Sequence, residues 1–153
     1  MRPTQAIIDL AAVRQNVREI RASLPPATRL IAVVKANAYG HGAIPVSRAA
    51  LGAGADWLAV AIPEEGIELR AAGIRAPILV LGLTLPEQAS LFAEHDLTAT
   101  VASIEGLEVF HNIGRTKKLP IRVMLKLDTG MGRIGIKPEN VVAFARQAQS
   151  LSG

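Results

Sequence analysis

The amino-acid sequence predicts an α/β fold built from repeated strand–helix units. Short apolar runs rich in β-branched residues alternate with longer amphipathic stretches along its 153 residues. Continuous apolar runs are typical of parallel strands covered on both faces, whereas half-exposed strands alternate apolar and polar residues. Two architectures share this pattern, an open doubly wound sheet and a closed (β/α)8 barrel.

Each predicted element follows from one such run or stretch. Strands are expected at residues 6–8, 30–34, 57–61, 78–81, 97–101 and 121–127. The stretches between them predict helices at residues 10–23, 43–51, 63–72, 86–93 and 104–116. Boundary signals support several of these helices. They are Asp9 and Ser103 as N-caps, Pro63 and Pro86 in first turns, and Gly54 and Gly73 as C-terminal caps.

The length limits how much of a barrel can be present. A complete (β/α)8 barrel takes roughly 250 residues, so this chain can supply about five barrel strands. We expect residues 1–9 to form a strand outside such a barrel and residues 10–153 to form part of it. Residues 149–153 are typical of the exit of a helix, so we interpret the sequence as a piece of a larger protein.

Composition narrows the function classes. The absence of cysteine excludes disulfides and thiolate chemistry, and it suits a reducing compartment. A net charge of +4 would suit nucleic acid, but no aromatic residues interleave with the basic ones as stacking platforms. The N-terminus has no secretion signal, and no apolar run approaches the roughly 20 residues of a membrane helix. We therefore expect a cytoplasmic protein without a nucleic-acid or membrane partner.

A lysine follows the second apolar run. Side chains alternate along a strand, so Ile31, Val33 and Lys35 share one face, which the first two place in the core. Lys35 then stands at the carboxyl end of a strand, where parallel α/β proteins carry out chemistry. A neutral amine there can form a Schiff base. A lysine that merely extends into solvent is equally compatible with the position.

A glycine-rich stretch follows the last apolar run. Gly130, Gly132 and Gly135 match the G-x-G-x-x-G spacing of dinucleotide-binding proteins. That fingerprint needs a helix to open at once, but residues 136–138 intervene before the expected helix start. The alternative is a loop that directs Arg133 into a site, where its planar guanidinium can bind a carboxylate through two hydrogen bonds.

Both stretches resemble motifs of the alanine racemase family. Residues 33–42, Val-Val-Lys-Ala-Asn-Ala-Tyr-Gly-His-Gly, are similar to its cofactor-attachment motif, and residues 127–135, Leu-Asp-Thr-Gly-Met-Gly-Arg-Ile-Gly, to its arginine loop. The resemblance implies a partial TIM-type (β/α)8 barrel, pyridoxal 5'-phosphate as cofactor and no metal ion. It implies that Lys35 attaches the cofactor and is the catalytic base on one face of Cα. Tyr39 would contact the cofactor phosphate. Arg133 would contact the substrate carboxylate and the cofactor's phenolic oxygen.

Lys126 is a further candidate. Its side chain lies on the same face of the strand as those of Met124 and Asp128. Both faces of a barrel strand are buried, and a buried ammonium without a partner is costly. In many family members the matching lysine is carbamylated, and the resulting anion holds the arginine. We hypothesise that Lys126 carries such a carbamate; the alternative is an ordinary lysine paired with Asp128 or with solvent. His41 is expected to be a structural, hydrogen-bonding loop residue.

The resemblance implies an enzyme that interconverts L- and D-alanine by two-base proton transfer at Cα. It further implies a cytoplasmic homodimer that supplies D-alanine for peptidoglycan precursors. The family's second base is a tyrosine of a C-terminal β domain, which we expect to lie outside these residues, leaving the fragment weakly active or inactive. Two alternatives stay open. One is a non-catalytic barrel protein that binds the cofactor, although such proteins lack the Ala-Tyr-Gly-His-Gly continuation. The other is a racemase of another amino acid, such as serine or lysine.

Overall fold

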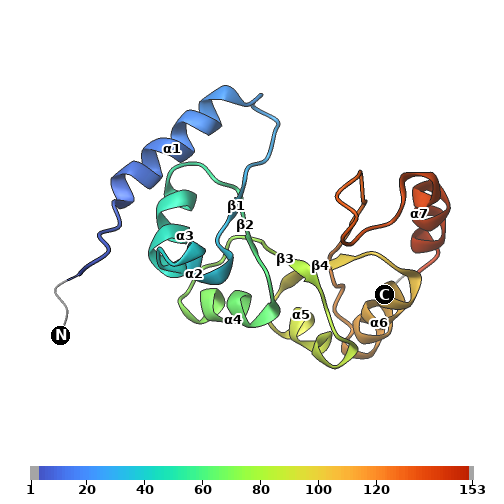
Figure 1. Ribbon diagram of the computed structural model, residues 1–153. Coiled ribbons are helices and arrows are strands. Elements are labelled where there is room, and N and C mark those ends of the chain that lie inside the picture. Colours follow the sequence, from blue (N-terminus) through green and yellow to red (C-terminus); the bar gives the residue numbers. More distant parts are fainter. Residues whose placement is uncertain (1–3, 152–153) are drawn as a thin grey trace.

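The computed structural model describes residues 4–151, which form a parallel sheet with helices packed against it (Figure 1). Its strands are β1 (Ile31–Val33), β2 (Trp57–Val60), β3 (Ile78–Leu83), β4 (Leu97–Val101) and β5 (Val123–Leu125). Each strand pairs in parallel with the next one along the chain, from Ile31 opposite Trp57 to Val101 opposite Leu125. The five barrel strands expected from the sequence are therefore confirmed.

The strand order separates the two predicted architectures. A doubly wound sheet reverses its order at a switch point, whereas the strands of a (β/α)8 barrel follow one another in chain order. The observed order is β1-β2-β3-β4-β5, so the sheet is an arc of the barrel type. Figure 1 shows α4, α5 and α6 along one side of the strands, as the outer helices of a barrel lie.

Helices connect the strands, most of them at the predicted places, and the short element at Lys35–Tyr39 is an addition that was not predicted. They are α1 (Leu10–Ser23), α2 (Lys35–Tyr39), α3 (Ala43–Gly52), α4 (Pro63–Ala71), α5 (Ser90–Glu94), α6 (Ile104–Lys117) and α7 (Val141–Gln149), with 3-10 turns at Pro86–Gln88 and Pro138–Asn140. Asp9 caps α1 and Ser103 caps α6 through side-chain oxygens that accept backbone N–H groups, as predicted. No helix within residues 4–151 is long and apolar enough to cross a bilayer.

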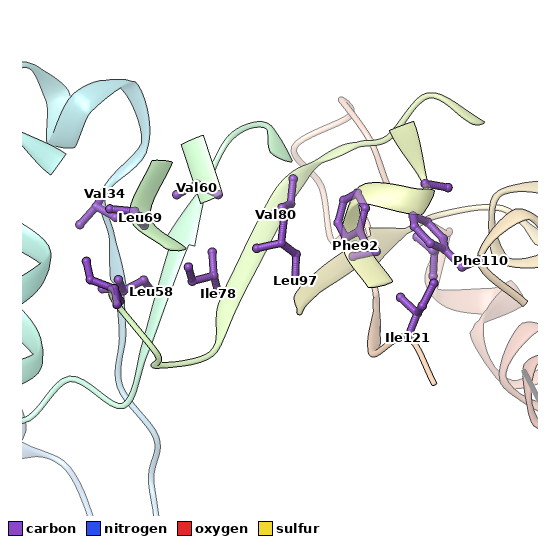
Figure 2. Close-up of a cluster of buried hydrophobic side chains, with 14 of the residues drawn as sticks. Val34, Leu58, Val60, Leu69, Ile78, Val80, Phe92, Leu97, Phe110 and Ile121 are labelled. Atoms are coloured by element: carbon purple, nitrogen blue, oxygen red, sulfur yellow. The ribbon is translucent and has the colours of Figure 1, made fainter. Parts of the chain in front are cut away.

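The core lies between the sheet and its outer helices. Alternate strand residues supply one layer, and residues of α4, α5 and α6 supply the other (Figure 2). Phe92 and Phe110 meet edge to face, with ring centroids 5.1 Å apart. Each large side chain buried here contributes about 1.5–3 kcal/mol to stability. The principal members are Val34, Leu58, Val60, Leu69, Ile78, Val80, Phe92, Leu97 and Phe110.

The opposite, inner face of the arc is partly open. Ala32 and Val34 pack in the core, so Val33 between them points the other way, and it is 42% exposed. The expectation that Val33 and Lys35 share a buried face is therefore wrong. In a closed barrel, side chains from strands across the axis fill this space, and residues 4–151 supply only one arc of strands.

The expected N-terminal strand is not formed. Residues 4–9 have no regular secondary structure, and residues 1–3 of the predicted segment lie outside the described residues. Ile7 is 88% exposed, and no described strand pairs with the segment. A strand needs a ladder partner for its N–H and C=O groups, so the apolar run alone does not produce one.

Candidate active site

The residues singled out by the sequence gather at one end of the sheet. Lys35 follows the carboxyl end of β1, and the loop with Arg133 follows the carboxyl end of β5. Parallel strands place these two ends at the same edge of the sheet, although β1 and β5 are its outermost strands. In barrels this edge carries the active site.

The segment after Lys35 has an unusual backbone. Ala36, Asn37, Ala38 and Tyr39 all lie in the left-handed region, with φ between 51° and 54°. The element α2 is therefore a left-handed turn, in which the Gly40 N–H donates to the Ala36 carbonyl at 3.0 Å. A left-handed residue costs roughly 1–2 kcal/mol when it is not glycine, so the surrounding structure must hold this turn in place.

Three hydrogen bonds from outside the backbone hold the turn. The Ala36 N–H donates to Glu65 Oε1 at 2.6 Å. The Asn37 Oδ1 accepts the Ala43 N–H at 2.7 Å and so fixes the turn to the start of α3. The His41 ring donates from Nδ1 to the Ala38 carbonyl at 2.9 Å, which is the kind of loop hydrogen bond expected of it.

The left-handed turn brings Lys35 and Tyr39 together. Lys35 Nζ lies 5.9 Å from the centroid of the Tyr39 ring, within the range of a cation–π contact. The Tyr39 side chain is 60% exposed, so its hydroxyl is available to a ligand. A primary amine can condense with an aldehyde, and a phenol hydroxyl can donate a hydrogen bond to a phosphate. The pair thus offers two functions needed to hold one aldehyde-bearing phosphate ester.

Asp128 organises the arginine loop. Its Oδ1 accepts the N–H groups of Gly130 and Gly132, each at 3.0 Å. The Gly132 and Gly130 bonds hold the pKa of Asp128 below its ordinary value, because they stabilise the carboxylate. Gly135 has a φ of 139° and packs directly against the backbone of Asp128. This position requires glycine, since a Cβ would overlap that backbone.

The glycines do not form a dinucleotide fingerprint. A 3-10 turn at Pro138–Asn140 and then α7 follow the loop, so no helix opens at the glycines. The rejection of that fingerprint is confirmed. Arg133, within this loop, is exposed. Within residues 4–151 its guanidinium forms no ion pair.

Lys126 differs from the expectation. It is exposed rather than buried, because β5 is an edge strand and its residues are only half-buried. The alternative pairing with Asp128 is not formed either, since no ion pair of Lys126 occurs within the described part of the chain. The Lys126 N–H donates to the Val101 carbonyl at 2.8 Å, which fixes its backbone next to β4.

The sequence reasoning missed Glu65. It lies in the first turn of α4 together with Glu64, where an acidic side chain interacts favourably with the helix dipole whatever else it contacts. The bond to Ala36 joins residues 29 apart in the chain. No local pattern encodes such a bond, although a glutamate at the third helical position is the signal of a capping box.

The chain is similar to known proteins in sequence and in structure. A sequence profile described as alanine racemase, N-terminal domain, matches residues 8–153. An alanine racemase of Symbiobacterium thermophilum is 50% identical over 151 residues, which cover 99% of this chain and 40% of the relative. The solved structure of an alanine racemase of Clostridium difficile 630 superposes with a TM-score of 0.93 at 37% identity, over 99% of this chain and 40% of that one.

A histidine racemase of Leuconostoc mesenteroides subsp. sake is also structurally similar. Its TM-score is 0.85 at 33% identity, and the match covers 95% of this chain and 39% of that one. The chain therefore spans about 40% of the length of the relatives that it matches.

Proposed function

This chain belongs to the alanine racemase family, whose N-terminal domain it matches, and on that basis we propose that the intact protein is a pyridoxal-phosphate-dependent alanine racemase. The observation that carries the proposal is the pairing of Lys35 with Tyr39 on one left-handed turn, at the carboxyl end of β1. This arrangement supports Lys35 as the attachment site and Tyr39 as a ligand of the cofactor phosphate.

The donor set fits the cofactor. The family depends on pyridoxal 5'-phosphate, which presents an aldehyde and a phosphate. The amine of Lys35 suits the first group and the exposed hydroxyl of Tyr39 suits the second, and the two side chains lie against each other. When bound, the cofactor supplies an electron sink that acidifies the Cα–H bond of an amino acid.

Residues of this chain would supply three further functions. Lys35 Nζ moves a proton at Cα on one face of the substrate, as a general acid and base. Arg133 binds the substrate carboxylate, and it also binds the cofactor's phenolic oxygen, because its planar fork offers several donors. The Asp128 loop presents Arg133 at the same edge of the sheet as Lys35.

A carbamate on Lys126 forms part of the proposal. Lys126 immediately follows β5 and precedes the arginine loop, so an anion there would lie next in sequence to the segment that carries Arg133. The amine of Lys126 can react with carbon dioxide only in its neutral form, so burial of Lys126 in the intact protein would favour the modification. Electron density or an intact-mass difference at Lys126 tests it.

Racemisation also needs a second base on the opposite face of Cα. We propose that a tyrosine beyond these residues supplies it in a homodimer, as the family resemblance implies. The same resemblance supports a cytoplasmic enzyme that makes D-alanine for peptidoglycan. Light scattering of the intact protein tests the homodimer. Growth of a D-alanine auxotroph that carries the gene tests the production of D-alanine.

One specific observation favours a second substrate. A histidine racemase shares this fold at 33% identity, and neither Lys35 nor Arg133 reads the amino-acid side chain. A racemase of another amino acid is therefore the alternative. A non-catalytic cofactor-binding barrel is less favoured, since the curated relatives here are named as racemases.

Assays of the full-length protein separate these readings. Purified protein with added cofactor should racemise L-alanine faster than histidine or serine and show a visible band that borohydride removes. Lys35→Ala should abolish both the band and the activity, whereas Lys137→Ala, at an exposed lysine in the other half of the chain, should change neither. A band without activity toward any amino acid would support the binding protein instead.

A further inference from the structure

We propose that Glu65 is a positioning residue for Lys35, because its carboxylate fastens the left-handed turn to the neighbouring strand end. The inference deepens the proposed function and rests on it for the role of Lys35. The bonds that carry it are properties of the chain itself.

One carboxylate links two loops. Glu65 Oε1 accepts the Ala36 N–H at 2.6 Å, and Oε2 accepts the Ala61 N–H at 2.7 Å and the Ile62 N–H at 3.4 Å. Ala36 follows β1 by three residues, and Ala61 directly follows β2. These strands are paired neighbours, so Glu65 bridges their carboxyl ends, at the edge of the sheet where Lys35 lies.

Each bonded N–H would otherwise lack a partner. Ala36 is the first left-handed residue of the turn. Its N–H has no partner within the turn, just as the first N–H groups of any helix have none within the helix. Ala61 lies just past the last residue of β2, where the ladder with β3 ends. Distances of 2.6 and 2.7 Å place both bonds at or below the short end of the range for N–H···O hydrogen bonds.

The bond from Ala36 to Glu65 fixes the start of the left-handed turn, directly after Lys35. The Lys35 carbonyl carbon is bonded to the Ala36 nitrogen that Glu65 binds, and the three residues after it carry the strain up to Tyr39. The far end of the turn has its own anchor in Asn37. Glu65 acts through the backbone, since within residues 4–151 no ion pair joins it to Lys35.

The substitution Glu65→Gln tests whether the turn needs both oxygens of the carboxylate. Glu65→Gln keeps the size of the side chain but replaces one oxygen with an NH2 group, which cannot accept from an N–H. One of the two loops must then lose its acceptor. Glu68→Gln is the matched control, because it removes the same charge from an exposed position of the same helix.

Two measurements on the full-length protein test the proposal. Without cofactor, hydrogen exchange of whichever amide loses its acceptor, Ala36 or Ala61, should accelerate at least about tenfold in Glu65→Gln, and both amides should stay unchanged in Glu68→Gln. With cofactor, Glu65→Gln should weaken formation of the borohydride-sensitive band by about tenfold or more and shift the pH at which that band titrates. Glu65→Asp keeps both acceptor oxygens and should restore part of each property.

The outcomes distinguish the two proposals. Unchanged exchange at both Ala36 and Ala61 in Glu65→Gln, or an equal effect of Glu68→Gln, overturns the role of Glu65. Altered exchange with a band that forms and titrates as in the parent protein also overturns it, because the turn would then not position Lys35. Absence of the band in the parent protein refutes the cofactor proposal, and the exchange data still report on the link. If Glu65→Gln does not fold, Glu65→Asp decides through the same two readouts.

Discussion

At the scale of single residues, Asp128 makes the loop of Arg133 sensitive to acid. Bonds from Gly132 and Gly130 lower its folded pKa below the unfolded one. A carboxyl group with a lowered pKa stabilises the fold above its ordinary titration range, and that contribution is lost as the pH falls through the lowered pKa. We expect NMR of the Asp128 carboxyl to show titration below that of a free aspartate, with the Gly130 and Gly132 amide signals shifting in parallel.

The control for this titration is Asp128→Asn. Both glycine N–H groups donate to one oxygen, Oδ1, which an asparagine retains. The variant should therefore keep the loop at neutral pH and lose its acid transition. An Asp128 that titrates at its ordinary value or above would contradict the role of these two bonds.

Tyr39 contributes to ligand binding rather than to stability. Its side chain is largely exposed, so Tyr39→Phe should change the free energy of unfolding by no more than about 0.5 kcal/mol. Loss of one hydrogen bond to a charged phosphate should weaken cofactor binding roughly tenfold to a hundredfold. Absorbance titration gives the dissociation constant of the cofactor, and thermal denaturation gives the change in stability. An equal loss of stability and affinity would contradict the assignment.

At the scale of structural elements, the arginine loop depends on Gly135. Its φ of 139° and its contact with the Asp128 backbone exclude a side chain. Gly135→Ala should strain the loop by about 1–3 kcal/mol, raise KM for the substrate and leave cofactor attachment unchanged, because Lys35 follows the opposite edge strand. Gly52→Ala is the control, since Gly52 ends α3 with open space around it; a KM unchanged in both would refute the prediction.

Elements formed by local signals could be predicted from the sequence, and the left-handed turn could not. The bounds of α1 match the prediction of residues 10–23, because an N-cap and helical periodicity are encoded within the segment itself. Ala36 and Ala38 have no intrinsic preference for the left-handed region. Bonds from Glu65 and from the Asn37 side chain to distant backbone impose it, and tertiary bonds of this kind leave no periodic signature.

In the candidate site, too, some features could be predicted from local sequence signals and others depend on distant parts of the chain. The positions of Lys35 and Arg133 at the carboxyl ends of β1 and β5 follow from their sequence spacing to apolar runs. The exposures of Val33 and Lys126 do not, because burial on the inner face depends on which strands lie across the barrel axis. Sequence patterns predict which faces are apolar and not what covers them.

At the scale of the whole molecule, residues 1–153 expressed alone should associate. The strands β1 and β5 are the edges of the described sheet, and unpaired parallel edges invite pairing with other chains. Apolar residues such as Val33 and Leu83 remain exposed on the inner face and at its rim, where a closed barrel would cover them. We expect light scattering to show oligomers that bind a hydrophobic dye, and racemase activity far below that of the full-length protein. A monomer that does not bind the dye would contradict this expectation, because the apolar inner face would then be covered by residues of the same chain.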